Sequence, residues 1–230
     1  MKLKLKKNEY PGKLIVFEGT DGAGKTTLIK LAAEYLIEVF GKNDVVVTKQ
    51  PTDMSRKTKL FQKMMYCSNH EDIDYRAVQL LTLSDRVQHG FEEIEPALKD
   101  GKFVICDRYI YTSVANMLAR GYMDEKWFFE AAKNIVKPDI TFLAHVPPEL
   151  AIARIKARPE ECNRHLDERQ LRKVNAEFLK MRRSEGFDIL DTSASAEKPF
   201  EIIKEHIIRT LAKNRIYIRQ ANVTTASSIL

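Results

Sequence analysis

The stretch that most constrains this chain is GTDGAGKT at residues 19–26, which follows the apolar run LIVF at residues 14–17. It matches the pattern G-x-x-x-x-G-K-[S/T], which binds phosphate when a strand precedes it and a helix follows it. Apolar residues recur at helical spacing after Lys25, at positions 28, 31, 32, 35, 36 and 39. Free amides and the positive dipole end of that helix would face an anion. The sequence therefore predicts a nucleotide phosphate site rather than a glycine-rich turn with an ordinary surface lysine.

The same pattern assigns chemistry to individual residues of the loop. Lys25 is expected to reach the β- and γ-phosphates, and the Thr26 hydroxyl is expected to bind Mg²⁺. The predicted nucleotide-binding residues are Gly19, Asp21, Gly22, Ala23, Gly24, Lys25, Thr26 and Thr27.

The rest of the chain alternates apolar strand-like runs with helical segments. The runs at residues 45–48, 103–106, 140–146 and 187–190 indicate four further strands. This alternation predicts an α/β fold of the P-loop NTPase type, with three layers, a five-stranded parallel sheet and helices on both faces.

Charged residues follow the second and third strands. Lys49 comes after residues 45–48, and Asp107 and Arg108 come after residues 103–106. Ligands bind beyond the carboxyl ends of strands in such sheets, so we expect these side chains to meet the phosphate loop. Asp107 is a predicted Mg²⁺ ligand together with Thr26, with capping of the next helix as the alternative. Arg108 is expected to clamp a phosphate through its planar fork.

Composition limits the remaining function classes. The 230 residues carry a net charge of +6, with 44% hydrophobic and 30% charged residues, which is typical of a soluble globular protein. Binding of polyanionic nucleotides explains the charge without nucleic acid, for which no motif is present. No apolar run approaches the ~18 residues of a membrane helix, and the basic N-terminus lacks the apolar region of a secretory signal. Three widely spaced cysteines favour reduced thiols in a cytoplasmic protein.

Three blocks in order along the chain resemble the thymidylate kinase family. They are FEGTDGAGKTT at residues 17–27, LSDR followed by Gln88-His89 at residues 83–89, and DRY at residues 107–109 with Thr112 and Ala115. The resemblance runs from residue 14 to about residue 190. It implies a nucleoside monophosphate kinase that moves the γ-phosphoryl group of Mg-ATP onto dTMP. It also implies a homodimer, for which the apolar helix expected over residues 75–98 is a candidate interface.

The resemblance also implies a domain plan and a lid. We expect one kinase domain over residues 1–213, with a lid at about 154–169, and a C-terminal tail over residues 214–230. The lid carries Arg154, Arg158 and Arg164. In this family the catalytic arginine comes from the phosphate loop or from the lid, and residues 20–23 contain no basic residue. The lid must therefore supply it, and Arg158 is our first choice.

Roles at the acceptor site follow from the resemblance position by position. Asp21 falls near the acceptor sugar, Lys49 near the transferring phosphate, and Arg86 at a carbonyl of the base, unless Arg86 lies on a solvated helix face. The predicted catalytic residues are Lys25, Asp107, Arg108 and Arg158. The predicted acceptor-binding residues are Asp21, Lys49, Thr82, Arg86, Arg108 and Asn116.

Several acceptor positions depart from the family pattern. Thr82 stands where a phenylalanine usually stacks on thymine, and Asn116-Met117 stands where the family commonly has Tyr-Gln. Loss of a stacking ring removes ~1–3 kcal/mol of base binding, and Phe61 and Tyr66 are candidates to replace it. Three hypotheses therefore remain: a dTMP kinase, a related enzyme repurposed for another phosphorylated acceptor, and a nucleotide-binding regulatory module without transferase activity.

Overall fold

Five parallel strands form the centre of the computed structural model, which describes residues 3–68, 72–159 and 165–213. Their order across the sheet is β2-β3-β1-β4-β5, so the chain crosses over between neighbours, as parallel pairing requires. The predicted α/β fold class is confirmed. The strands are β1 (Lys13–Glu18), β2 (Val45–Lys49), β3 (Phe103–Asp107), β4 (Ile140–His145) and β5 (Asp188–Asp191).

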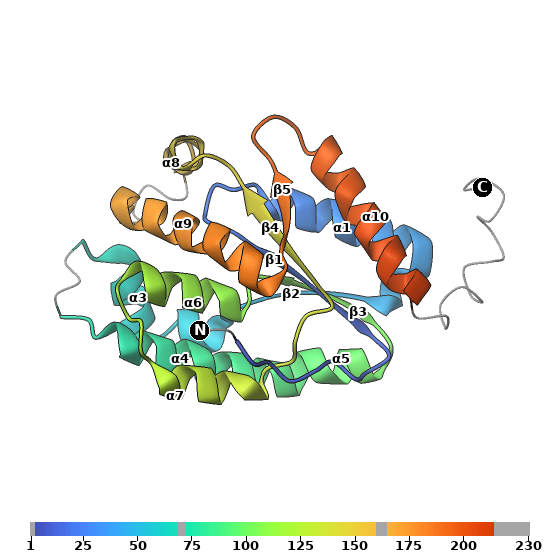
Figure 1. Cartoon of the computed structure of the whole chain (residues 1–230), viewed down its shortest axis with the longest axis horizontal. Helices are drawn as coiled ribbons and strands as arrows, with labels where there is room; N and C mark the ends of the chain where they lie inside the picture. The colour runs from blue at the N-terminus through green and yellow to red at the C-terminus, as the bar shows by residue number, and fades with distance from the viewer. Residues whose placement is uncertain (1–2, 69–71, 160–164, 214–230) are drawn as a thin grey trace.

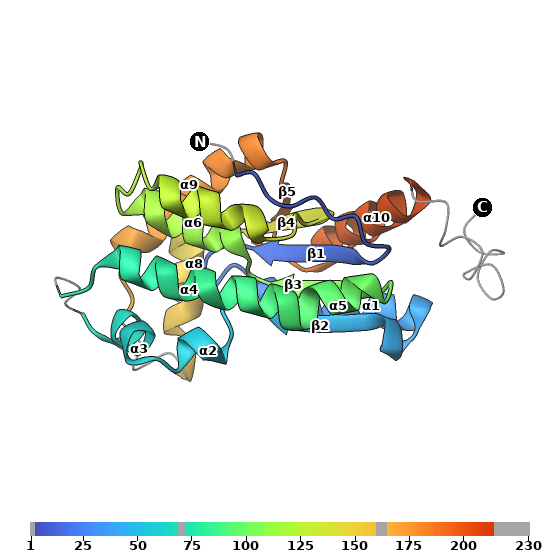
Figure 2. The same ribbon diagram turned by 90° about the horizontal axis from the view of Figure 1, so that it is seen from below.

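Helices cover both faces of this sheet (Figures 1 and 2). Consecutive strand side chains point to opposite faces, so Leu14 and Val16 belong to one core cluster and Ile15 and Phe17 to the other. The first cluster includes α4 to α7 and α9; the second includes α1, α8 and α10. The helices are α1 (Lys25–Phe40), α2 (Asp53–Arg56), α3 (Lys59–Tyr66), α4 (Tyr75–His89), α5 (Glu95–Lys99), α6 (Ile110–Ala119), α7 (Lys126–Ala131), α8 (Pro148–Lys156), α9 (Glu168–Glu185) and α10 (Glu197–Lys213).

Two helix predictions need correction. The sequence from about Ser55 to Tyr66 predicts one helix, but the structure has two, α2 and α3, because the Thr58 side chain accepts a hydrogen bond from the Phe61 amide and starts a new helix. The helix expected over residues 75–98 is interrupted by a π-helical turn, Gly90–Ile94, that joins α4 to α5. Both differences concern local hydrogen bonding, which apolar periodicity does not report.

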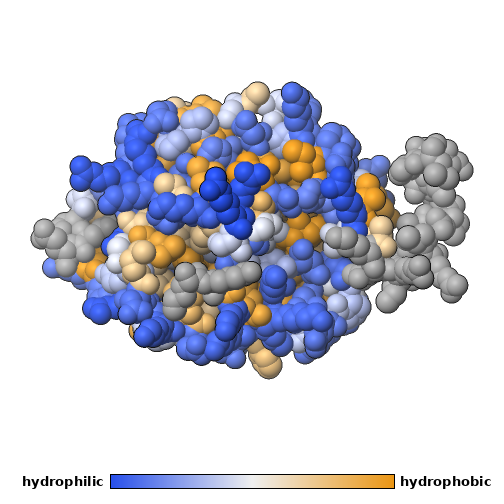
Figure 3. Space-filling view, in the orientation of Figure 1, coloured by the Kyte–Doolittle hydropathy of each residue, from blue (hydrophilic) through white to orange (hydrophobic). Residues whose placement is uncertain are grey.

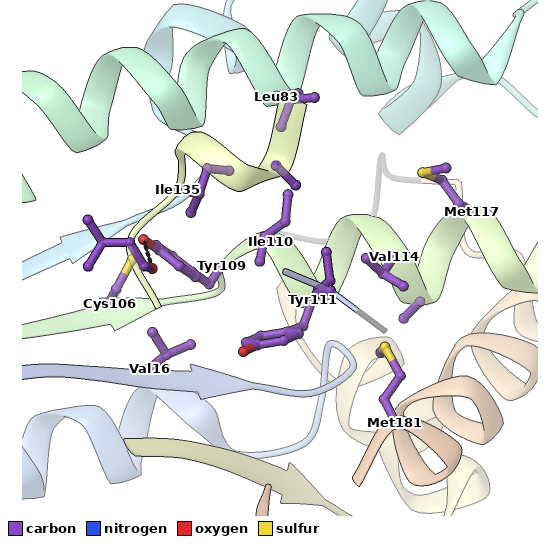
Figure 4. Close-up of a cluster of buried hydrophobic side chains, with 14 of the residues drawn as sticks. Val16, Leu83, Cys106, Tyr109, Ile110, Tyr111, Val114, Met117, Ile135 and Met181 are labelled. Atoms are coloured by element: carbon purple, nitrogen blue, oxygen red, sulfur yellow. Dashed lines mark hydrogen bonds between the residues drawn. The ribbon is translucent and has the colours of Figure 1, made fainter. Parts of the chain in front are cut away.

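The segment that leads from β3 into α6 is anchored in the first core cluster. Figure 4 shows Tyr109 and Tyr111 packed among Val16 of β1, Cys106 of β3 and Met181 of α9. The buried Tyr109 hydroxyl donates to the Val136 carbonyl at 2.9 Å. This anchoring fixes the backbone on the carboxyl side of Arg108.

The strand register brings three strand ends to one level. Asp107 at the end of β3 pairs with Phe17 of β1 on one side and with Lys49 of β2 on the other. The phosphate loop leaves β1 directly after Glu18. The charged residues predicted to converge therefore lie at one edge of the sheet.

The surface shown in Figure 3 is mostly hydrophilic, with separate hydrophobic patches between charged groups. Across the described ranges, no helix has the length and apolar character needed to cross a membrane. Cys67 and Cys106 are free thiols. Cys162, the central part of the expected lid (residues 160–164) and the expected tail (residues 214–230) lie outside the described residues.

We expect Gly22→Ala to lower the free energy of unfolding by more than Gly186→Ala does. Both glycines have a φ of 77°, which costs an L-residue about 1–2 kcal/mol. A Cβ at Gly22 would also lie 2.4 Å from the Ala151 carbonyl oxygen, whereas a Cβ at Gly186 meets nothing within 4 Å. Chemical denaturation of both variants measures the difference, which we expect to be about 1 kcal/mol or more. Equal losses would show that the loop backbone is not tightly packed against α8.

Candidate active site

A cleft of about 480 Å³ opens at the carboxyl edge of the sheet. It is lined by the phosphate loop, the ends of β2 and β3, and side chains of α3, α4, α6 and α9. Most of the predicted site residues line it: Asp21, Gly22, Gly24, Lys25, Thr26, Lys49, Thr82, Arg86, Asp107, Arg108, Asn116 and Arg158. Gly19 and Ala23 are buried within the loop behind the cleft wall, and Thr27 is exposed on α1.

The phosphate loop follows the tight path expected from its glycines. Gly19, Gly22 and Gly24 all have positive φ, at 135°, 77° and 79°. Lys25 is buried, and its Nζ donates to the carbonyls of Gly19 (3.1 Å) and Thr20 (2.8 Å). The ammonium is thus held by two backbone carbonyl oxygens at the wall of the cleft.

The Lys25 ammonium is strongly desolvated. Burial, followed by the nearby Arg108 guanidinium, lowers the pKa of Lys25 from 10.5 to about 8, although Asp21, Asp107 and Glu18 act in the opposite direction. An anion bound at this position would restore the favourable electrostatics of the charged form. The loop therefore has the properties of a polyphosphate site.

Arg108 connects the end of β3 to the phosphate loop. It is the one non-glycine residue in the described chain with positive φ, at 65°, and its backbone amide donates to the Phe17 carbonyl at 2.9 Å. Its Nη1 donates to the Gly19 carbonyl at 2.9 Å and its Nη2 pairs with the Asp21 carboxylate. Burial alone would lower the pKa of Arg108, but Asp21, Asp107 and Glu18 outweigh it and the pKa is raised. The guanidinium is a permanent cation in the cleft.

Glu18 is a structural part of the site to which the sequence assigned no role. Its side chain is fully buried and accepts hydrogen bonds from the amides of Tyr109 (2.9 Å) and Thr112 (3.1 Å) and from the Thr112 hydroxyl (2.5 Å). Burial raises the pKa of Glu18, although Thr112 and Arg108 oppose the shift. The signal in the sequence that could have identified this role is that Glu18 is a charged residue at the end of the apolar run of β1. Glu18 holds the backbone that follows Arg108.

Arg86 lies inside the cleft rather than on a solvated helix face. It is 2% exposed, its Nη1 donates to the Thr82 carbonyl at 2.9 Å, and its Nη2 donates to the Tyr109 carbonyl at 3.3 Å. Burial lowers its pKa, and Glu18 and Asp85 act against this. Both terminal nitrogens are thus fixed by backbone oxygens.

The cleft that contains Arg86 also carries polar and aromatic side chains. Asn116 donates to the Thr112 carbonyl at 2.9 Å and accepts from Arg120 at 2.8 Å. The aromatic candidates Phe61 and Tyr66 both line the cleft, as does Tyr75. Rings are therefore present even though Thr82 replaces the expected phenylalanine.

The two described lid arginines have different surroundings. Arg158 is half-buried and lines the cleft. Arg154 instead donates to the carbonyls of Gly22 (3.4 Å) and Thr192 (2.9 Å) and so joins α8 to the phosphate loop and to the segment after β5. Arg164, the third predicted lid arginine, lies outside the described residues.

Polar atoms without hydrogen-bond partners gather in this cleft. Five buried side-chain atoms lack a partner within the part of the chain that the structure describes, and four of them belong to cleft residues. Native proteins satisfy nearly all buried polar groups, so such a concentration indicates a ligand site. The four atoms are Gln79 Oε1, Arg86 Nε, Asp107 Oδ1 and Gln170 Nε2.

Asp107 and Thr26 have the chemistry that Mg²⁺ requires. Asp107 Oδ1 is buried without a hydrogen-bond partner, and the Thr26 hydroxyl lines the same cleft. Mg²⁺ is usually held by one or two protein oxygens together with phosphate oxygens and water. A larger His, Cys, Asp or Glu cluster is absent from the described residues, and this mode of binding does not need one.

Comparisons with known proteins agree on one family. The family model described as thymidylate kinase matches residues 17–207. The probable thymidylate kinase of Pyrococcus abyssi is 38% identical over 200 residues, covering 84% of this chain and 94% of that protein. The thymidylate kinase of Oenococcus oeni is 34% identical over 196 residues, covering 81% and 91%. The crystal structure of thymidylate kinase from Ehrlichia chaffeensis matches with a TM-score of 0.61 at 26% identity, covering 87% of this chain and 98% of that one.

We expect Lys25→Met to be at least as stable as the wild type at pH 7 in the absence of ligand. A pKa depressed from 10.5 to about 8 means that the folded wild type pays on the order of 3 kcal/mol to keep Lys25 charged. The two hydrogen bonds lost with Nζ offset part of this gain. Because the unfolded chain binds more protons between pH 8 and 10.5, wild-type stability should rise relative to the variant across that window. Denaturation curves at several pH values test the sign; a gap independent of pH would contradict it.

Proposed function

The chain belongs to the thymidylate kinase family, and we propose that it transfers the γ-phosphoryl group of Mg-ATP to dTMP. Family membership identifies it as a nucleoside monophosphate kinase. The choice of dTMP, ATP and Mg²⁺ is our proposal. The observation that carries it is that Lys25, Arg108 and Arg86 all line one cleft.

At the donor end, we assign the β- and γ-phosphates of ATP to Lys25 and to the amides of the phosphate loop. Gly22 and Gly24 allow the loop backbone to approach them closely. Thr26 and Asp107 would hold Mg²⁺, which neutralises charge on the phosphate oxygens when bound. Ala23 and Thr27 shape the loop and the first turn of α1 rather than the cleft wall.

In the transfer step, an anionic oxygen of the acceptor phosphate forms a bond to the γ-phosphorus while the bond to the β–γ bridging oxygen breaks, and ADP leaves. The acceptor oxygen already carries negative charge, so no dedicated base is needed. Negative charge spreads over the transferring oxygens, and the cations of Lys25, Arg108 and Arg158 stabilise it. The acceptor phosphate would compete with Asp21 for the Arg108 guanidinium, and Lys49 lies at the same strand edge.

At the acceptor end, we assign a carbonyl of the base to Arg86. Its Nε is the donor left over after its other nitrogens bind backbone carbonyls. Phe61 or Tyr66 would supply the stacking ring that Thr82 does not. Asn116 lies on α6 and lines the cleft. It stands where the family commonly has a tyrosine, and its side chain is smaller than a tyrosine.

The lid proposed over about residues 154–169 would close on this cleft and exclude water. Arg158 is the described lid cation on the cleft wall, which supports its assignment as the catalytic lid arginine. One kinase domain over residues 1–213 fits this plan. The free thiols of Cys67 and Cys106 favour the cytoplasm as its location.

A second candidate is an enzyme of the same family with a different phosphorylated acceptor. Thr82 and Asn116 both line the acceptor end, and Met64 and Met65 add an adaptable apolar wall. A regulatory module without transferase activity has less support, because it would not need Arg86 and Arg158 around an acceptor cleft.

We expect rapid ADP release with Mg-ATP and dTMP, weaker turnover with dUMP, and little with other nucleoside monophosphates. A coupled assay with dTMP, dUMP, UMP, CMP, GMP and AMP measures this. Lys25→Met should reduce kcat at least about a thousandfold, since it removes a cation from the transferring phosphate. Circular dichroism should show an unchanged fold.

The outcomes separate the hypotheses. Near-normal turnover by Lys25→Met would overturn the assigned role of Lys25. A ribonucleotide preference would favour the second candidate, and tight ATP binding without turnover would favour a regulatory module.

We also propose that the chain forms a homodimer through the outer face of α4. Leu80 and Val87 of α4 and Phe91 of the π-helical turn that continues it are 56%, 39% and 72% exposed, and their spacings of seven and four residues place them along one side of the helix. Figure 2 shows α4 in front of the sheet in that view. A second copy would bury this apolar stripe by an isologous contact.

We expect sedimentation velocity to give a dimer for the wild type and a monomer for Phe91→Asp, because a buried unpaired carboxylate opposes association. Met123→Asp is the matched control, since Met123 is 69% exposed but lies between α6 and α7. A monomeric wild type, or equal effects of both substitutions, would contradict the α4 interface.

A further inference from the structure

We propose that Gln79 determines the class of base that the acceptor carries, by accepting a hydrogen bond from a ring N–H beside the carbonyl bound by Arg86. The inference rests on the proposed function, because it assumes a nucleotide acceptor in this cleft. It assigns to Gln79 a selection for keto bases over amino bases. Neither the motif blocks nor the family match assigns a role to this residue.

Gln79 is a buried polar residue on the cleft wall. It is 3% exposed, it lines the cleft, and its Oε1 has no hydrogen-bond partner within the described residues. An unsatisfied buried acceptor costs about 1–3 kcal/mol, so its retention on a cleft wall points to a ligand. The missing partner is a donor.

Tyr75 lies one helical turn before Gln79, is buried and lines the same cleft. Burial raises the pKa of Tyr75, and the neighbouring side chains of Arg120, Arg86 and Gln79 oppose this shift. The Tyr75 ring is held in turn by the Arg120 guanidinium, 4.1 Å from its centroid, and by the Tyr122 ring at 6.1 Å. Since Oε1 is the Gln79 atom that lacks a partner among the described residues, the amide offers its oxygen to a ligand.

Arg86 supplies the complementary donor. It lies seven residues after Gln79, so both lie on the same side of α4. Its Nε has no partner, whereas Nη1 and Nη2 are held by the carbonyls of Thr82 and Tyr109. The Thr82 hydroxyl donates to the Gln79 backbone carbonyl, so it does not use the Gln79 side-chain oxygen. One helical face thus presents an unpartnered acceptor and an unpartnered donor.

This pair matches keto bases and opposes amino bases. Uracil, thymine and guanine place a carbonyl acceptor next to a ring N–H donor. Cytosine and adenine place an amino donor next to a ring nitrogen acceptor, which would set donor against Arg86 and acceptor against Gln79. Sites that hydrogen-bond a substrate discriminate strongly because a mismatch leaves buried groups unpaired.

The test compares dUMP with dCMP, which share sugar and phosphate and differ at the base edge. We expect kcat/KM of the wild type to favour dUMP. Gln79→Met keeps the side-chain length but removes the acceptor, so kcat/KM for dUMP should fall about tenfold to a hundredfold while that for dCMP changes little. The loss should appear mainly in KM, because the contact is made in the bound substrate as well as in the transition state.

Two further variants separate selection from packing. Gln88→Met changes the same residue type on the exposed face of α4 and should leave both acceptors unaffected. Tyr75→Phe keeps the ring but removes the phenol oxygen one helical turn before Gln79, so it should lower the ratio of dUMP to dCMP kcat/KM several-fold even if Gln79→Met does not fold. Thermal unfolding of each variant reports on folding.

The proposal is overturned if Gln79→Met weakens both acceptors equally, if neither Gln79→Met nor Tyr75→Phe alters the ratio, or if the wild type uses dUMP and dCMP alike. In these cases a wild type that still phosphorylates dTMP leaves the proposed function intact. A wild type that phosphorylates no nucleotide overturns both.

Discussion

The Arg108 guanidinium is the contact on which the site depends. It reaches from the end of β3 to the Gly19 carbonyl and the Asp21 carboxylate, and so joins two segments that are far apart in sequence. Its left-handed backbone is held by the Phe17 carbonyl before it and by Glu18, which binds the Tyr109 and Thr112 amides after it. Because these groups are buried, removal of any one would leave charges or amides unpaired at low dielectric.

The sequence predicts the parts of the molecule that follow from local pattern. The strand, loop and helix around Lys25 are contiguous, and Asp107 could be placed because the carboxyl ends of parallel strands meet at one edge. Glu18 received no role because its partners lie more than 90 residues away. The α2–α3 boundary depends on the side-chain cap at Thr58, and the π-helical turn is a local change of backbone hydrogen bonding that apolar periodicity does not report. The site assignments remain predictions, while the fold class is confirmed.

Helix α4 shows why amphipathic pattern alone could not settle the acceptor end. An ordinary surface helix buries its apolar face and exposes its polar one. Here Gln79, Thr82 and Arg86 are buried on the same helix as the apolar Val78 and Leu83, whereas Leu80 of α4 and Phe91 of the π-helical turn after it are more than half exposed. The buried side carries polar groups at a cleft and the exposed side carries apolar groups, so periodicity identifies the helix but does not assign its faces. The buried polar groups support the proposed acceptor site, and the exposed apolar groups support the proposed dimer contact.

The cost of the buried charges explains why the cleft is completed by a ligand rather than by the chain. Lys25 and Arg86 are both buried, and desolvation lowers the pKa of each. The protein could have lowered this cost with additional carboxylates, but these would repel phosphate. Of the carboxylates near Arg108, Asp21 is the one paired directly with its guanidinium, and an incoming phosphate would compete for that contact. The folded chain therefore keeps desolvated cations and unpartnered polar atoms at one edge of the sheet. The negative charge of bound phosphoryl groups would offset the desolvation cost of these cations.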